Sequence, residues 1–384
     1  MMKNKTKIIF FSVFIFLLSA VYAAGIAAYP PEAVSVFGGG DAVYPTAFDE
    51  VTFDAGAEEP LSGKIQSALN VSAYQNVRLI PSGDAFGVKF FTKGVLVVGM
   101  SEIELDGKSV NPAYDAGIRV KDIIVKINGK EINSIDEMTA AVDENGEGEA
   151  SFELLREGGP VTVRVKPVKV EDGKYKTGLW VRDSAAGIGT ITFIEPESGA
   201  FGGLGHGICD VDTGELMPLL KGAVTDVRIN GIVKGRAGTP GELRGFFLER
   251  RTGALISNTD QGVFGILESE QRTGETVPVA QKGEVKEGKA TIRCTLDKSG
   301  PAEYEIEILR IVSPDTDTKN FIVRVTDKRL LELTGGIVQG MSGSPILQSG
   351  KLVGAVTHVL VGDPQKGYGI FIENMLKGAA EALE

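Results

Sequence analysis

Residues 336–359 read GIVQGMSGSPILQSGKLVGAVTHV, a glycine- and serine-rich turn followed by a stretch in which apolar residues alternate. The alternation is typical of β-strands, and the question is whether Ser342 in the turn is a nucleophile or only part of a tight turn. Turn signals recur about every 8–12 residues from residue 175 onward, which predicts an all-β sandwich or barrel over 175–384. The final stretch, IENMLKGAAEALE, has apolar residues at helical spacing and predicts a helix that packs against the barrels.

A serine becomes a nucleophile only with a base beside it and with donors for the oxyanion that forms. Gly340 lies two residues before Ser342, so the Gly340 and Ser342 N–H groups can point at one spot and form an oxyanion hole. The order G-x-S-G-x-P resembles that of trypsin-like proteases. Ser344 is the rival nucleophile, but only Ser342 has glycines at the required offsets. Ser342 is therefore the predicted nucleophile.

The choice of base is narrow, because the chain has two histidines. His206 lies in AFGGLGHGICD, a glycine-flanked turn where the ring can stand at a cleft. His358 lies in an alternating apolar stretch and has the pattern of a structural strand residue. The chain order, histidine before serine, also favours His206 as the general base. The alternative reading of His206 is a residue that stabilises its turn.

Several aspartates could orient the imidazole as the third member of a triad. Asp327, in RVTDKRLLELTGG, closes a predicted β-run 15 residues before Ser342. Asp210, Asp260 and Asp363 are rivals, and spacing alone leaves the choice open.

The N-terminus predicts export through a membrane. Lysines at positions 3, 5 and 7 precede Ile8–Ala28, a run of 21 residues without charge. That length suffices to cross a bilayer with the basic end in the cytoplasm, which favours a single-pass anchor over residues 1–28. The stretch SAVYAAG also suits signal-peptidase cleavage, so a cleaved signal peptide is the alternative. Residues 29–84, with Pro30-Pro31 and the acidic AGAEEP, are predicted to form a tether and a partly ordered linker.

Residues 85–170 show the order of elements of a small peptide-binding domain. AFGVKFFTKGVLVVG predicts two strands joined at a glycine, Asn128-Gly129 a type I′ turn, and Ser134 with Glu137 a capping box. The central AGIRVKDIIVKING resembles the PDZ family, which binds a peptide as an added strand. The resemblance implies that Ala85, Phe86, Gly87 and Val88 form the loop that binds the peptide carboxylate. The alternative is a hairpin domain with a purely structural role.

Composition excludes some classes of function. The formal net charge of −11 argues against a nucleic-acid partner, which requires a basic surface. Two histidines and no CxxC pair argue against a metal site, and we expect no cofactor. Cys209 and Cys294 could form one disulfide or remain two small buried side chains, and the sequence leaves both alternatives open.

The whole chain resembles the stage IV sporulation protein B (SpoIVB) family, membrane-anchored PDZ serine peptidases of endospore-forming bacteria. The resemblance is carried by AAGIGTITFIEPESGAFGGLGHGICD, by VTDKRLLELTGGIVQGMSGSPILQSGKLVGAVTHV and by the ending GYGIFIENML. It implies a trypsin-like double β-barrel with His206, Asp327 and Ser342 as the catalytic triad. The short distance from Asp327 to Ser342 departs from ordinary trypsin-like enzymes, in which the acid lies nearer the histidine.

The resemblance also implies a role in signalling. Family members cross the forespore inner membrane, act in the space between forespore and mother cell, and cleave themselves near the N-terminus, which could release them. They then cut the extracytoplasmic part of a membrane-complex subunit that restrains an intramembrane metalloprotease, and this triggers processing of a sigma-factor precursor. The PDZ domain would bind the substrate or the chain's own N-terminal segment. The alternative function is a non-catalytic PDZ adaptor on the extracytoplasmic membrane face.

Overall fold

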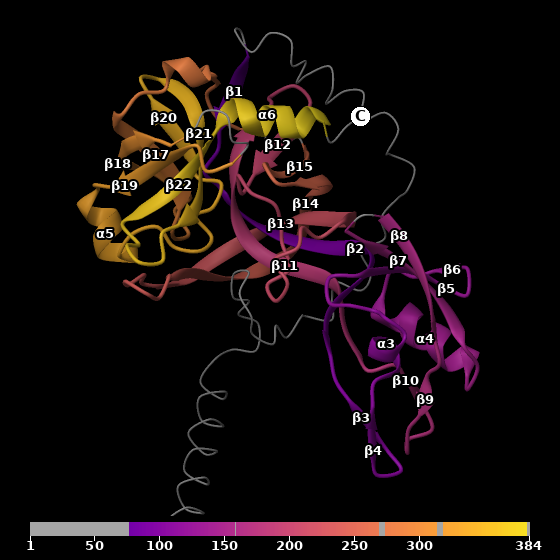
Figure 1. Ribbon diagram of the computed structural model, residues 1–384. Coiled ribbons are helices and arrows are strands. Elements are labelled where there is room, and N and C mark those ends of the chain that lie inside the picture. The colour runs from indigo at the N-terminus through magenta and orange to yellow at the C-terminus, as the bar shows by residue number, and fades with distance from the viewer. Residues whose placement is uncertain (1–76, 158, 269–272, 313–317, 382–384) are drawn as a thin grey trace, which may run out of the picture.

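The computed structural model describes residues 77–157, 159–268, 273–312 and 318–381. In this part of the chain two closed antiparallel β-barrels lie side by side, and a smaller lobe extends from the first of them (Figure 1). The predicted mainly-β architecture with two barrels and a PDZ-like lobe is confirmed. Three short elements lie outside these units: β1 (Arg78–Pro81), β16 (Val277–Pro278) and the 3₁₀ helix η5 (Lys282–Glu284).

Six strands form the first barrel, and nearly 80 residues separate the first of them from the other five. The order is β11–β12–β15–β14–β13–β2, and β2 pairs back with β11 to close the barrel. Phe86, Val88 and Phe90 on β2 point into its core, where the Phe86 and Phe201 rings meet edge to face at 5.9 Å between centroids. The strands are β2 (Ala85–Met100), β11 (Leu179–Ile194), β12 (Ala200–Gly203), β13 (Leu219–Val233), β14 (Glu242–Thr259) and β15 (Gly262–Leu267).

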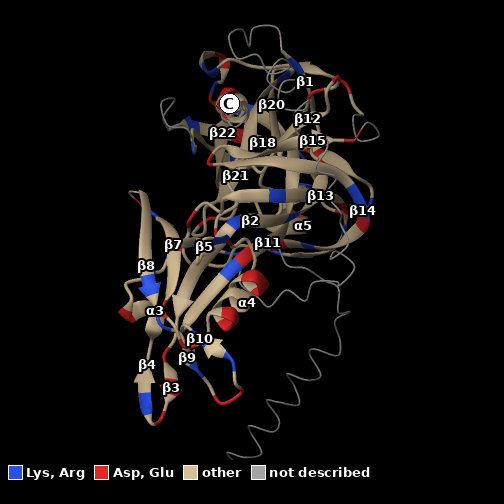
Figure 2. Cartoon of the chain, turned by 90° about the vertical axis from the view of Figure 1, so that its right-hand side faces the viewer, with Lys and Arg blue, Asp and Glu red and all other residues tan. Residues whose placement is uncertain are grey.

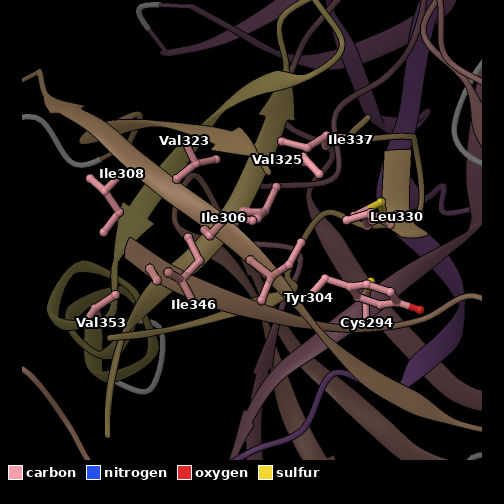
Figure 3. Packing of buried hydrophobic residues seen from close by; sticks show 14 of the residues in the cluster. Cys294, Tyr304, Ile306, Ile308, Val323, Val325, Leu330, Ile337, Ile346 and Val353 are labelled. Atoms are coloured by element: carbon pink, nitrogen blue, oxygen red, sulfur yellow. The ribbon is translucent and has the colours of Figure 1, made fainter. Parts of the chain in front are cut away.

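The second barrel also has six strands, in the order β17–β18–β19–β22–β21–β20. Figure 3 shows its packed interior, in which Ile306, Val323 and Cys294 are buried. Burial raises the pKa of the Cys294 thiol to about 12. Cys209 is exposed, and both thiols are free. The strands are β17 (Gly288–Thr295), β18 (Pro301–Ile311), β19 (Phe321–Val325), β20 (Pro345–Gln348), β21 (Lys351–Val359) and β22 (Lys366–Phe371).

Two helices accompany the second barrel. Helix α5 (Lys328–Thr334) follows β19 and ends at Gly335, whose left-handed φ of 74° is typical of a helix C-terminus. Helix α6 (Ile372–Glu381) follows β22 and buries Ile372, Met375 and Leu376 against strands of both barrels. The predicted C-terminal helix, which buries the apolar face that its spacing indicates, is therefore confirmed.

The smaller lobe lies between β2 and β11 in the sequence and projects away from the barrels (Figure 2). Its local signals fold as predicted. Asn128 and Gly129 have φ of 51° and 79°, as a type I′ turn requires. Ser134 caps its helix by accepting from the Glu137 N–H at 3.1 Å. The elements are β3 (Ile103–Leu105), β4 (Lys108–Val110), α3 (Pro112–Asp115), β5 (Ile123–Ile127), β6 (Lys130–Glu131), α4 (Ile135–Asn145), β7 (Ala150–Arg156), β8 (Gly159–Val165), β9 (Val168–Lys169) and β10 (Tyr175–Lys176).

Strand β2 differs from the prediction. The two strands expected in residues 85–99 are one strand of 16 residues. Its first part pairs with β11 and β13 in the barrel, and its second part pairs with β5 in the lobe. The prediction that Ala85–Val88 form a carboxylate-binding loop is therefore wrong, because these residues lie in a buried barrel strand. The pattern of alternating apolar residues is the same in a domain of either kind, so it could not identify the partner strands.

The predicted anchor, residues 1–28, lies outside the described residues, as does the tether up to residue 76. Residues 78–81 of the predicted linker form β1, which pairs with β11 and β16. Among the described residues, no helix has both the length and the apolar composition to span a membrane.

Candidate active site

Ser342 lies in a turn between α5 and β20, at the boundary between the two barrels. Gly340 and Gly343 have φ of 97° and 95°, which glycine adopts without strain. A Cβ atom on Gly343 would lie 2.0 Å from the carbonyl oxygen of Thr190, so no larger residue fits this close approach. Ser344 is fully buried and donates its hydroxyl to the Met341 carbonyl at 2.7 Å. Ser344 therefore stabilises the turn, and the half-buried Ser342 is the serine that a substrate can reach.

The carbonyl groups of the turn are held by the first barrel. The Thr190 hydroxyl donates to the Gly340 carbonyl at 2.8 Å, and the Thr190 N–H donates to the Ser342 carbonyl at 3.0 Å. In the described part of the chain, the N–H groups of Gly340 and Ser342 donate no hydrogen bond. These are the two donors that the sequence predicts for the oxyanion hole, and both are available to a ligand.

His206 lies in the loop after β12, which packs directly on β21. A Cβ atom on Gly205 would lie 3.0 Å from the Thr357 methyl group. The His206 Nδ1 lies 2.8 Å from the Gly207 carbonyl oxygen, and because a carbonyl only accepts, Nδ1 carries the proton. Nε2 then has the free lone pair that a general base requires. The pKa of His206 is lowered by desolvation and by Lys319, against the opposing effect of the Gly207 hydrogen bond.

The second histidine also belongs to this site, which the sequence did not predict. The His206 and His358 rings lie 4.6 Å apart between centroids, with 36° between their planes. The residue before His358 is Thr357, whose carbonyl accepts the Ser342 hydroxyl at 2.6 Å. Desolvation, His206 and Lys319 lower the pKa of His358. The signal in the sequence is the small number of histidines. Because the chain has only two, each is a candidate site residue.

Asp327 has other partners in this structure. It is the N-cap of α5 and accepts from the Arg329 N–H at 2.8 Å and from the Leu330 N–H at 3.2 Å. Its carboxylate also pairs with the Arg329 guanidinium at 2.9 Å, which lowers the pKa of Asp327. Among the described residues, no carboxylate is hydrogen-bonded to His206 or His358. The structure thus brings Ser342, His206 and His358 together, and the role of Asp327 as third triad member stays a prediction.

Asp327 is joined to neither histidine by a hydrogen bond that the structure shows, and its partners lie in α5 and β18. Lys319, which acts on both imidazoles, comes just before β19, whereas Asp327 comes just after this strand. Two of the rival aspartates have partners as well, since Asp210 pairs with Arg182 and Asp363 pairs with Lys366. Spacing along the sequence could not reveal all of these partners, because Asp210 and Arg182 lie on different elements that meet only in the folded chain.

The lobe has a groove beside α4 that the sequence did not identify. Its volume is about 410 Å³, and it runs between α4 and the segment of residues 174–181, which leads into β11 and includes its first residues. Trp180 in this segment is 62% exposed, which is unusual for so large an apolar side chain. The apolar lining consists of Ile103, Ile135, Met138, Val142, Leu179, Trp180 and Val181, with Lys174 and Lys176 at its border.

Comparison with protein families assigns the two parts of the chain. The model of the SpoIVB peptidase S55 family matches residues 173–376, and a PDZ-domain model matches residues 92–166. The barrel part of β2, residues 85–91, precedes both matches. No curated protein sequence matches the chain significantly.

Solved structures resemble parts of the chain at low identity. The active form of the Rv3671c protease from M. tuberculosis is 13% identical over 52% of this chain and 74% of that chain, with a TM-score of 0.31. The HtrA-type protease AlgW with a decapeptide is 13% identical over 55% of this chain and 54% of that chain, with a TM-score of 0.32. The PDZ domain of an SdrC-like protein from Listeria monocytogenes is 18% identical over 23% and 87%, with a TM-score of 0.19.

The peptidase family model covers more than half of the chain and includes His206, the Ser342 turn and His358. The residues that the structure gathers at the boundary of the barrels therefore lie within the matched family domain. The chain is a serine peptidase that belongs to the SpoIVB peptidase S55 family and also contains a PDZ domain.

Proposed function

We propose that the chain is an exported, membrane-anchored serine endopeptidase with Ser342 as nucleophile and His206 as general base. The observation that carries this proposal is the Ser342 turn, in which the serine lies beside two available N–H groups and next to the loop of His206. The family resemblance assigns Asp327 the third position. In this structure Asp327 caps α5 and pairs with Arg329, so the proposal rests on Ser342 and His206.

The geometry supports acyl transfer. Ser342 Oγ leaves the Thr357 carbonyl, attacks the scissile carbonyl and gives its proton to Nε2 of His206. The N–H groups of Gly340 and Ser342 stabilise the oxyanion. The imidazolium then protonates the leaving amine, and water hydrolyses the acyl-enzyme by the same route. The low pKa of His206 keeps the imidazole neutral, and thus able to accept this proton, at neutral pH.

We further propose that the peptidase acts in sporulation signalling. In this proposal residues 1–28 anchor it in the forespore inner membrane, and the enzyme cleaves itself within the tether. It then cuts the extracytoplasmic part of a membrane-complex subunit that restrains an intramembrane metalloprotease, which triggers processing of a sigma-factor precursor. Membership of the SpoIVB family and the apolar N-terminal segment support this role.

The groove beside α4 is the site where we propose that the PDZ domain binds a peptide, in place of the predicted Ala85–Val88 loop. An extended peptide could pair with the segment Gly178–Val181, which pairs on one side with β2, and place its apolar side chains on α4. The peptide would come from the protein substrate or from the chain's own N-terminal segment.

The test compares the wild-type chain with Ser342→Ala by mass spectrometry and by labelling with a fluorophosphonate. Ser342→Ala should stay folded, lose labelling and lose N-terminal trimming, because nothing replaces the nucleophile; loss of a catalytic serine costs about 10⁶-fold in rate. Ser299→Ala is the matched control, since Ser299 is exposed on the β17–β18 turn. Labelling or trimming of Ser342→Ala at the wild-type rate, in a protease-deficient host, would contradict the proposal.

A further inference from the structure

The two histidines of the chain come from different barrels and meet at the nucleophile. His206 follows β12 of the first barrel, and His358 lies near the end of β21 in the second. Their ring centroids are 4.6 Å apart. Both are tied to the Ser342 turn: the residue before His358 binds the Ser342 hydroxyl, and the loop of His206 packs against Thr357.

Within the described ranges, no carboxylate of the kind that usually holds a catalytic imidazole is bound to His206. A carboxylate at Nδ1 fixes both the tautomer and the orientation of the ring. Here a neutral acceptor, the Gly207 carbonyl of the adjacent residue, fixes the tautomer through Nδ1. This bond comes from the residue next to His206 itself, so it does not fix the ring relative to Ser342. The contact that comes from the other barrel is the His358 ring.

The position of His358 depends on an irregularity in β21. The pairing of β21 with β22 shifts register between Val356 and Val359, so Thr357 and His358 lie at a bulge. Bulges re-aim side chains and are frequent beside active sites. Here the Thr357 carbonyl faces Ser342, and the imidazole of His358 meets that of His206. A regular strand would instead continue the alternation of the apolar residues that precede Thr357.

We propose that His358 is a positioning residue of the peptidase, whose ring holds the His206 imidazole in the orientation that accepts the Ser342 proton. This inference rests on the proposed function. In this proposal His358 acts through His206, and its ring does from the side what a carboxylate does at Nδ1 in a triad. Lys319 is the charged group that acts on both rings, and it disfavours a second positive charge there.

The pH dependence separates positioning from a general loss of structure. The base must be neutral, and desolvation is the largest cause of the low pKa of His206, so the wild-type rate should hold to a pH below the ordinary histidine pKa of about 6.5. Removal of the His358 ring admits water to the face of His206. The pKa of His206 should then rise toward its ordinary value, and the acid limb of the rate profile should move to higher pH.

The experiment measures the rate at which a fluorophosphonate labels Ser342 in the full chain between about pH 5 and about pH 9, a range that spans the ordinary histidine pKa of about 6.5. His358→Ala should label up to about 100-fold more slowly, the cost of a misplaced catalytic group, and its acid limb should lie at higher pH. His358→Phe keeps a ring against His206, so its rate should stay within about threefold of wild type with an unmoved acid limb. Val361→Ala, exposed on the same hairpin, is the matched control.

Each result decides the matter. A wild-type rate and profile in His358→Ala would overturn the proposal, and so would a slower rate with an unmoved acid limb, because that pattern indicates a structural effect alone. Equal losses in His358→Phe and His358→Ala would also overturn it, provided that thermal unfolding shows both variants folded. Failure of the wild-type chain to label at all would instead refute the proposed function. An NMR titration of the same variants then decides on the ring contact, because an unchanged His206 pKa in His358→Ala would overturn it.

Discussion

Single residues determine how the site is prepared for catalysis. The Ser342 hydroxyl donates to the Thr357 carbonyl, so the nucleophile is held in place but not yet activated. The sequence could identify Ser342 and His206, because one G-x-S-G-x-P turn and two histidines leave few choices. It could not identify His358, because the ring contact arises where β21 packs on the loop after β12, and no local pattern records that packing.

Asp327 allows a prediction at the same scale. Asn is as good an N-cap as Asp, so Asp327→Asn should keep α5 and its stability, whereas Asp327→Ala should lose about 1 kcal/mol in the free energy of unfolding. Because Asp327 caps a helix and pairs with Arg329, we expect the Asn variant to label with a fluorophosphonate within a few-fold of the wild-type rate. Denaturant titration and labelling rates check both points. A folded Asn variant that labels about 10⁴-fold more slowly would instead establish Asp327 as the acid of a triad.

At the scale of elements, strand β11 connects the PDZ groove to the loop of His206. Leu179–Val181 line the groove, and the next residue, Arg182, pairs with Asp210 and with Asp212 at 2.8 Å. Asp210 is buried and also accepts from the Thr213 N–H and hydroxyl, each at 2.8 Å. One buried carboxylate therefore holds the turn at residues 210–213, which follows the loop of His206, and Arg182 compensates its charge.

Removal of Arg182 should consequently affect both stability and catalysis. Arg182→Met keeps the apolar stem but leaves the Asp210 carboxylate without its guanidinium, which should cost about 1–3 kcal/mol and slow the labelling of Ser342. Lys126→Met is the control, because it breaks an exposed pair with Glu153 at 3.8 Å that should contribute less than about 1 kcal/mol. Equal unfolding midpoints and labelling rates for the two variants would show that the Arg182 pair does not support the loop.

Elements with local signals were predictable, and those that depend on distant partners were not. The Ser134 cap and the Asn128-Gly129 turn need only neighbouring residues, and both form as predicted. Strand β2 is apolar along most of its length, yet its first part closes a barrel with strands more than 80 residues away. The sequence therefore predicted the class of the fold and missed the point at which one domain passes into the next.

At the scale of the whole molecule, the PDZ lobe is an insertion within the first barrel. The chain leaves the barrel along β2 and returns along β11, and these two strands pair with each other from Thr190 and Ala85 to Leu179 and Met100. The two domains thus share two continuous strands rather than a flexible linker. A movement of the lobe would be transmitted along β11 toward Thr190, which holds the Ser342 turn.

This connection predicts which shortened chains can fold. A chain that begins at residue 173 contains the family-matched segment but lacks β2, so β11 and β13 keep open edges and the core loses Phe86, Val88 and Phe90. We expect it to be unfolded or insoluble.

The second shortened chain begins at residue 77, and Asn-Gly replaces its residues 97–181. It keeps the antiparallel pair of Leu96 with Arg182, so the first barrel stays closed. It should fold cooperatively and label at Ser342, as circular dichroism and a fluorophosphonate would report. If the chain from residue 173 folds and labels as well as the rejoined one, β2 is dispensable and the barrel does not need the strand that precedes the PDZ lobe.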